Sequence, residues 1–386
     1  MLEDQMDLGI KIGNKNGGIH NGDDFCGLYR SDSTLYLVKR DLNNSANDIA
    51  EYLSSRLFNK IAPGYGAEIN IFHEQHHTYV VSTYFNSYQD LYKCAGFDER
   101  PLKQEYAESI FPVNQYITEE LLKLDEHEEY VYQDYEKAVV TSLFLGDFSL
   151  HSGNLGVVTT DNIKKLVRID FGAAFRSFSA EINPFQSIGN RLGLEKNYLK
   201  RDHPLDRIFC RTFCAELCRV AKIDLNETIM AEWRKIKTFF TQDDLVRFAQ
   251  RISSGSPSLK VDDIDVFLCH RLKQRQASLT QMAWEIELAL KLEFECEDEL
   301  REFLLTCSAR DLAKIKKLMH SPHLSAIAPF YAKEFQSVLL QERFSEVEQE
   351  NQCIAGNGLT FFEENKMIKN ENNTNALSDE EQDPLD

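Results

Sequence analysis

The spacing of hydrophobic and polar positions divides the first part of the chain into strands, a helix and a hairpin. Residues 8–40 show strand-like alternation interrupted by stretches of Gly, Asn and Asp, the composition of tight turns. In residues 45–61 the apolar positions recur every three or four residues, which predicts an amphipathic helix that ends at Pro63-Gly64. Residues 67–85 contain two apolar runs around a polar turn and predict a hairpin. The predicted order is therefore strand, Gly-rich turn, strand, helix and two strands.

The pattern becomes mainly helical after the hairpin. Residues 88–145 read as mainly helical, and an apolar helix over 135–146 leads into a loop. Two short strands are expected at 155–158 and 166–172, on either side of a polar turn. From about residue 202 onward the pattern is helical to the end of the ordered chain, and the segments 202–223, 227–240, 243–252 and 278–295 all carry apolar faces.

Composition and charge narrow the class of protein. Of the 386 residues, 42% are hydrophobic and 27% are charged, which is typical of a soluble globular chain long enough for two domains. The net charge of −19 argues against broad binding to nucleic acid, so no nucleic-acid partner is expected. The nine Cys are scattered, which favours a reducing compartment. The acidic N-terminus and the absence of a run of 18 apolar residues predict neither a signal peptide nor a transmembrane segment.

The strongest chemical signal is a pair of polar motifs. Asp147, His151 and Asn154 follow the apolar helix, and Asp170 with Phe171-Gly172 ends the second short strand. Phosphoryl transfer from ATP needs a carboxylate that orients the acceptor, together with a carboxamide and a second carboxylate that hold a metal against the phosphates. Mg²⁺ prefers such hard oxygen ligands. The two motifs therefore indicate ATP-dependent phosphotransfer.

These motifs resemble a family. Gly-Asp-x-x-Leu-His-x-x-Asn followed by Ile-Asp-Phe-Gly looks like the catalytic and metal loops of atypical kinases, namely the aminoglycoside, choline and phosphoinositide kinases and the HipA-like toxin kinases. The chain is also similar to kinase-like domains of Legionella Dot/Icm type IV effectors. The resemblance covers roughly residues 8–210. It implies that Asn154 and Asp170 bind Mg²⁺ or Mn²⁺ and that Asp147 is the catalytic carboxylate.

The spacing within the first motif departs from that family. In most of its members the catalytic Asp lies five residues before the Asn, whereas Asp147 lies seven residues before Asn154, and Ser149 occupies the position five before. Either the loop bulges so that Asp147 still reaches the acceptor, or His151 shares the handling of its proton. Both alternatives stay open at this point, and we favour Asp147.

The expected nucleotide contacts lie in the first part of the chain. By the resemblance, Lys39 is the strand lysine that neutralises phosphate charge, and Glu51 is the helix carboxylate that orients it, with Asp48 as the alternative. Gly17 and Gly18 belong to a Gly-rich stretch whose backbone N–H groups are candidates for covering the phosphates.

A basic segment follows the second motif. It stands out in an acidic chain, and in phosphoinositide kinases the corresponding segment reads the acidic head group. We therefore expect it to bind an inositol phosphate, a phosphoinositide or a substrate phosphate, with a solvated helix face as the alternative. The candidate residues are Arg191, Lys196, Lys200, Arg201 and Arg207.

Together these observations predict an α+β chain with a two-lobed protein-kinase-like fold and an α-helical C-terminal domain. The expected parts are an N-lobe at 1–87, a C-lobe at 88–221, a helical domain at 222–345 that is a candidate for contact with anionic membrane, and an acidic disordered tail at 346–386.

The function implied is an ATP-dependent kinase acting on a protein Ser or Thr, secreted into a host cytosol and regulated by an inositol phosphate or phosphoinositide. A phosphoinositide kinase is the alternative. A kinase-fold adenylyltransferase and a pseudokinase that only binds are further alternatives.

Overall fold

The computed structural model describes the part of the chain that carries the two motifs. The described residues are 6–14, 23–74, 76–98, 110–147, 149–176, 178, 182, 204–208, 210–253 and 259–294. The chain divides into two compact units, Met1–Leu288 and Ala289–Asp386. All elements below except the last turns of the final helix belong to the first unit.

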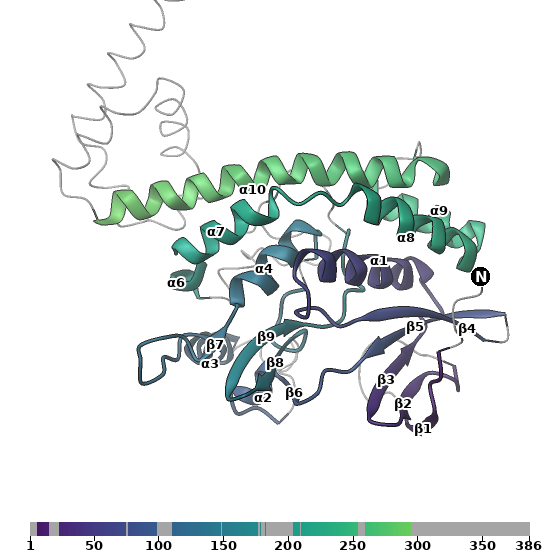
Figure 1. Ribbon diagram of the computed structural model, residues 1–386, viewed down its shortest axis with the longest axis horizontal. Helices are drawn as coiled ribbons and strands as arrows, with labels where there is room; N and C mark the ends of the chain where they lie inside the picture. The colour runs from purple at the N-terminus through teal and green to yellow at the C-terminus, as the bar shows by residue number, and fades with distance from the viewer. Residues whose placement is uncertain are drawn as a thin grey trace, which may run out of the picture. The chain divides into compact units, whose positions relative to one another are not determined.

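A five-stranded antiparallel sheet forms the N-terminal part (Figure 1). Its strand order is β1-β2-β3-β5-β4, and the strands are β1 (Ile10–Gly13), β2 (Gly27–Ser31), β3 (Thr34–Lys39), β4 (Ile69–Glu74) and β5 (His77–Thr83). Helix α1 (Ser45–Ile61) connects β3 to β4 and has the bounds that the periodicity predicts. The predicted hairpin at 67–85 is confirmed as β4 and β5, which pair antiparallel.

Helix α1 is covered on both sides. It contacts β4 and β5 of the sheet, and its other side packs against α4 (Tyr135–Phe144), α8 (Asn226–Phe239) and α9 (Gln242–Ile252). Several of its polar residues are buried along with the apolar ones, and two polar contacts reach the covering helices: the Tyr52 hydroxyl donates to Glu232 of α8, and Ser45 donates to Asp244 of α9. Figure 1 shows α1 between the sheet and these helices.

A second, four-stranded sheet carries the motifs. Its order is β6-β8-β9-β7, and the strands are β6 (Tyr88–Asp90), β7 (Tyr132–Gln133), β8 (Leu155–Thr160) and β9 (Ile163–Arg168). Helices α2 (Leu91–Cys94) and α3 (Ile110–Leu121) precede β7. The predicted strand over 166–172 is wrong at both ends, since β9 starts at Ile163 and stops at Arg168. The motif Asp170-Phe171-Gly172 therefore lies on a loop.

The remaining helices are α6 (Leu205–Ile208), α7 (Arg211–Val220), α8, α9, a short 3₁₀ helix η2 (Val261–Asp263) and α10 (Ile264–Phe294). Helix α10 contains most of the segment 278–295 and begins earlier, at Ile264, within the stretch that the sequence predicts to be helical. The stretch from 222 to 288, which the sequence assigned to a separate helical domain, belongs to the same compact unit as the two sheets. None of the described helices is long and apolar enough to cross a membrane.

Candidate functional site

Three charged side chains from separate elements meet between the two sheets. Lys39, at the end of β3, is 6% exposed and pairs with the carboxylate of Glu51 on α1. The Lys39 Nζ also lies 3.9 Å from Oδ1 of Asp170. Burial acts to lower the pKa of Lys39, but the two carboxylates outweigh it and raise this pKa above its ordinary value. The lysine is therefore firmly cationic.

Asp48, the other carboxylate that the sequence offered for Lys39, has a different partner. Its two oxygens accept the backbone N–H of Asp41 at 3.2 and 3.0 Å. Burial raises the pKa of Asp48 to about 8. Asp48 thus holds the entry to α1, and Glu51 is the residue that orients Lys39.

Asp170 occupies a strained position after β9. Its φ of 58° is in the left-handed region, which Asp tolerates better than most residues. The next residue, Phe171, is fully buried and packs on Phe58 of α1, with ring centroids 5.2 Å apart. The aromatic contact anchors the loop, while the Asp170 side chain keeps 44% of its surface exposed. This carboxylate is both fixed and accessible.

The loop that follows α4 begins with a turn that requires glycine. Gly146 has φ +67°, and a Cβ there would lie 3.2 Å from the ring of Phe178. The turn directs Asp147 into the interior, where its side chain is completely buried. Its Oδ2 accepts from the Arg168 guanidinium at 2.7 Å, and its Oδ1 accepts the backbone N–H of Ser149 at 3.1 Å. Burial raises the pKa of Asp147, with Arg168 acting in the opposite direction.

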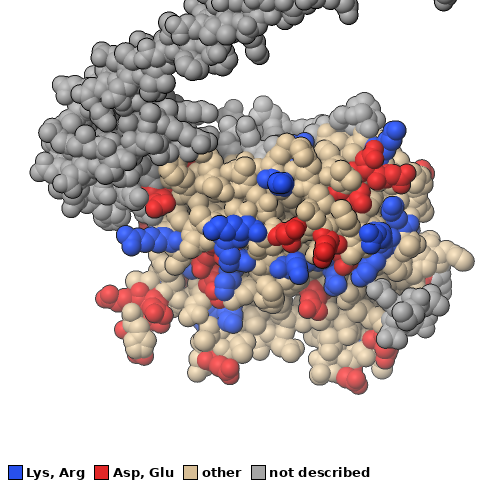
Figure 2. Space-filling view, turned by 45° about the horizontal axis from the view of Figure 1, so that its top comes forward, with Lys and Arg blue, Asp and Glu red and all other residues tan. Residues whose placement is uncertain are grey.

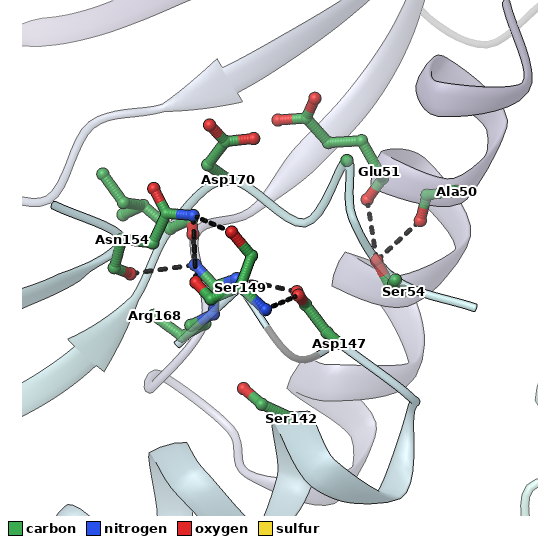
Figure 3. Close-up of polar contacts among 12 residues, drawn as sticks. Ala50, Glu51, Ser54, Ser142, Asp147, Ser149, Asn154, Arg168 and Asp170 are labelled. Carbon is green, nitrogen blue, oxygen red and sulfur yellow. Dashed lines mark hydrogen bonds and ion pairs between the residues drawn. The ribbon is translucent and has the colours of Figure 1, made fainter. Parts of the chain in front are cut away.

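Ser149, which is half-buried, and Asn154, which is buried, bond to each other within the same loop. The Asn154 Nδ2 donates to the backbone carbonyl of Ser149 at 3.1 Å and to its hydroxyl at 2.9 Å. These bonds orient the carboxamide oxygen away from Ser149. In the view of Figure 3, Asn154 and Asp170 lie on one side of Ser149 and Asp147 lies on the other.

His151 is half-buried in this loop. Its Nδ1 accepts the backbone N–H of Gly153 at 3.2 Å. This contact favours the neutral tautomer with its proton on Nε2.

The donor set fits a Mg²⁺–nucleotide site. Asn154 and Asp170 offer two hard oxygens, and Mg²⁺ is commonly held by one or two protein oxygens together with phosphates. Within the described residues, no group of three or more His, Cys, Asp or Glu side chains could hold a metal without such help.

Most of the other predicted site residues lie outside the described residues: Gly17, Gly18, Arg191, Lys196, Lys200 and Arg201. The exception is Arg207, which is 5% exposed and donates to the backbone carbonyls of Leu121 and Tyr132. Its guanidinium also lies over the rings of Tyr130 and Tyr135. Arg207 therefore links α6 to the end of α3 and to β7. On the face in Figure 2, basic and acidic side chains are interspersed.

Sequence reasoning did not find two residues that shape the site. Arg168 has no assigned role in the sequence analysis, yet it is buried and bonds Asp147. Arg251 was read only as part of an amphipathic helix, yet it donates to the backbone carbonyls of Gly172 and Ala174 in the Asp170 loop. The printed sequence carries no local signal for either contact.

Comparison with known proteins gives one family match and a similarity to a solved structure. Residues 80–284, more than half of the chain, match the family described as the LepB N-terminal domain. Among solved structures, the chain is similar to the crystal structure of a Helicobacter pylori proinflammatory kinase, CtkA, at 15% identity and a TM-score of 0.38. That match covers 75% of this chain and 99% of the other. None of the curated proteins matches.

Proposed function

The chain belongs to the LepB N-terminal domain family, and from this premise we propose that it is an ATP-dependent kinase that transfers the γ-phosphoryl group to an acceptor hydroxyl. One observation carries the proposal. Lys39 is buried, paired with Glu51 and 3.9 Å from the exposed carboxylate of Asp170. A cation and a carboxylate held in this relation, on a strand and on a loop, are what the binding of metal-bound nucleotide phosphates requires.

Each residue has a defined part in this reaction. Lys39 neutralises phosphate charge, and Glu51 holds the lysine in place. Asn154 and Asp170 would hold Mg²⁺ or Mn²⁺, which when bound neutralises charge that develops on the phosphate oxygens. Phosphoryl transfer passes through a loose transition state, so positioning and electrostatics account for most of the catalysis.

For the acceptor we propose a protein Ser or Thr hydroxyl, with a phosphoinositide hydroxyl as the alternative. LepB is a Legionella effector, so we propose that this chain too acts as a secreted effector in a host cytosol. The basic residues Arg191, Lys196, Lys200 and Arg201 are proposed to bind an inositol phosphate activator or the head group of a lipid. The experiment below separates these acceptors.

A specific observation favours a second candidate, a module that binds nucleotide without turnover. Asp147 is buried and bonded through both oxygens, and Ser149 occupies the position five before Asn154 that the catalytic Asp takes in most of the kinases that the motif resembles. A nucleotide-binding module needs Lys39 and Asp170 but no such carboxylate.

The test incubates the full chain and Mg²⁺ or Mn²⁺ with ATP labelled at the γ- or the α-phosphate. It includes a host-cell protein panel and phosphoinositide vesicles, each with and without inositol hexakisphosphate. We expect γ-label on an acceptor. Label from the α-position would instead identify an adenylyltransferase. Mg-ATP binding with no transfer in any arm would identify the binding module.

Asp170→Asn and Asp161→Asn form a matched pair for this test. Both residues are left-handed Asp residues on loops, with φ of 58° and 50°, and Asp161 is exposed in the turn between β8 and β9. Asn tolerates the left-handed conformation, so both variants should fold. We expect Asp170→Asn to abolish transfer and Mg-ATP binding, and Asp161→Asn to retain both.

A further inference from the structure

Helix α9 presents two side chains to the loop that carries Asp170. Phe248 and Arg251 are three residues apart and therefore lie on one face of the helix. The Phe248 ring is fully buried and packs edge-on against Phe175, with centroids 6.1 Å apart. The Arg251 Nη2 donates to the carbonyls of Gly172 and Ala174 at 2.6 Å, and its Nε donates to Ala174 at 3.0 Å.

The segment that Arg251 bonds lies between two strained residues. Asp170 and Phe175 have φ of 58° and 60°, and a left-handed conformation is a genuine outlier for a bulky residue such as Phe. Strained residues persist only where the surrounding structure holds them. The bonds to the carbonyls at 172 and 174, together with the packing of Phe175, supply that hold.

Arg251 also reaches the helix that carries Glu51. Its Nη1 donates to Oδ1 of Asn47 at 2.5 Å, and Asn47 lies one helical turn before Glu51 on α1. One guanidinium thus joins α9, the first turn of α1 and the loop after Asp170. Two of these elements, α1 and the loop, carry the carboxylates of Glu51 and Asp170 that flank Lys39.

The cost of placing a charge here is considerable. Among the described residues no carboxylate forms an ion pair with Arg251, and Arg176 donates to the same Asn47 oxygen at 3.4 Å. Burial and the neighbouring Arg176 lower the pKa of Arg251 to about 9. A half-buried guanidinium bonded mainly to backbone carbonyls is not favourable as a general stabilising device, because the loss of water around a charge has to be compensated. Its geometry is suited to fixing the path of a loop.

We propose that α9 is a built-in brace of the metal loop and that Arg251 is a positioning residue, which sets the Asp170 carboxylate for metal-bound nucleotide by tying the loop to α1. This inference rests on the proposed function for its ligand. It assigns a role to the helical segment beyond residue 222, which carries no catalytic motif of its own.

The test compares Arg251→Met, Arg251→Lys and a control, Arg219→Met, in the full chain. Arg219 on α7 donates to the carbonyl of Ile61, the last residue of α1, at 3.0 Å, so it also tethers α1 but lies away from the metal loop. Calorimetry measures the affinity for ATP with Mg²⁺ and, separately, with EDTA, well below the melting temperature of each variant. Hydrogen exchange follows a peptide that covers residues 170–176.

Arg251→Met is expected to weaken Mg-ATP binding by about 10- to 100-fold, the usual loss when a residue that supports a metal ligand is removed. Binding of metal-free ATP should change little, and exchange in 170–176 should speed up. Arg251→Lys should recover part of the Mg-ATP affinity, because an ammonium can still donate to these carbonyls. Arg219→Met should lower the melting temperature while preserving the ratio of the two affinities.

The proposal is overturned if Arg251→Met lowers the melting temperature but leaves both the affinity ratio and the exchange of 170–176 at wild-type values. The proposed function fails in a different way, through a wild-type chain that binds no Mg-ATP. In that case faster exchange of 170–176 in Arg251→Met still supports the brace, and unchanged exchange refutes it.

Discussion

The carboxylate of Asp147 lies 2.7 Å from the guanidinium of Arg168, and both side chains are excluded from solvent. The pair joins the start of the loop after α4 to the end of β9, two residues before Asp170. Arg168 also donates to the backbone carbonyls of Asn154 and Ile169. Asp147 therefore holds the two loops of the site in register.

The first prediction follows from this burial. Asp147→Ala leaves the Arg168 guanidinium buried without its partner, and we expect a loss of about 3–5 kcal/mol in the free energy of unfolding. Urea denaturation measures it. The double variant Asp147→Leu with Arg168→Met should recover most of the loss, since paired replacement by apolar residues is often neutral.

A control for this prediction is the exposed pair Lys93–Asp90, whose side chains are 47% and 21% exposed. Lys93→Met should cost less than about 1 kcal/mol. A stable Asp147→Ala protein that has lost turnover would contradict our interpretation. It would identify Asp147 as the carboxylate that orients the acceptor hydroxyl.

The second prediction separates the two carboxylates on α1. Glu51→Gln removes the charge that holds Lys39, and we expect turnover to fall by about 10²-fold, the scale of losing one preorganised electrostatic contact. Asp48→Asn keeps an oxygen for the N–H of Asp41 and should leave turnover close to that of the wild type. Steady-state kinetics at saturating Mg-ATP gives both values. Equal losses in the two variants would mean that α1 as a whole, and not the Glu51 charge, sets the activity.

The sequence predicted the elements where the hydrophobic period is regular. Helix α1 has its predicted bounds because apolar residues recur at helical spacing throughout. The run after residue 166 is apolar as well, but β9 ends at Arg168 because the chain turns into the left-handed residue Asp170. Periodicity carries no information on such a turn.

Helix α10 carries a buried charge that its sequence pattern does not explain. Its buried face follows Ile264, Leu268, Leu272, Arg275 and Leu279 at helical spacing. Arg275 is a charged member of this otherwise apolar face. The guanidinium is buried because it donates to the carbonyls of Leu143 and Phe144 at the end of α4.

In the candidate site, too, the sequence does not reveal contacts between distant segments. Motif spacing found Asn154 and Asp170, but the partners of Asp147 and Asp170 come from distant parts of the chain.

The third prediction concerns stability against pH. The pKa of Asp48 is about 8 in the folded chain, against an ordinary value of 3.8. Between these values the folded state keeps the proton and the unfolded state loses it, so the unfolded state binds fewer protons and stability falls as pH rises. Each pKa unit corresponds to about 1.4 kcal/mol.

Asp48→Asn removes this titration and keeps the hydrogen bond. We therefore expect the stability advantage of Asp48→Asn over the wild type to grow between pH 5 and pH 8, the upper part of the window that the pKa of Asp48 defines, and to level off above it. Urea titrations of both proteins at four pH values measure the difference, in which other groups cancel. Parallel curves for the two proteins would show that Asp48 is ionised in the folded state.

The last prediction concerns the residue that stands five positions before Asn154. The Ser149 hydroxyl accepts from Asn154 Nδ2 at 2.9 Å, and Ser149 is half-buried. Ser149→Asp would place a carboxylate oxygen at this point and still satisfy the Asn154 amide. Because a positioned carboxylate can orient the acceptor hydroxyl, we expect turnover to rise by about 10²-fold, the lower end of general-base effects. Ser149→Asn, with the same shape and no charge, is the control. Calorimetry with Mg-ATP checks that neither change affects nucleotide binding.

Two outcomes would change the role of Ser149. If Ser149→Asp leaves turnover unchanged while Asp147→Asn abolishes it in a folded protein, then Asp147 reaches the acceptor and Ser149 only supports Asn154. If a wild-type chain without turnover gains it in Ser149→Asp, the natural protein is a binding module whose site lacks only the acceptor-facing carboxylate.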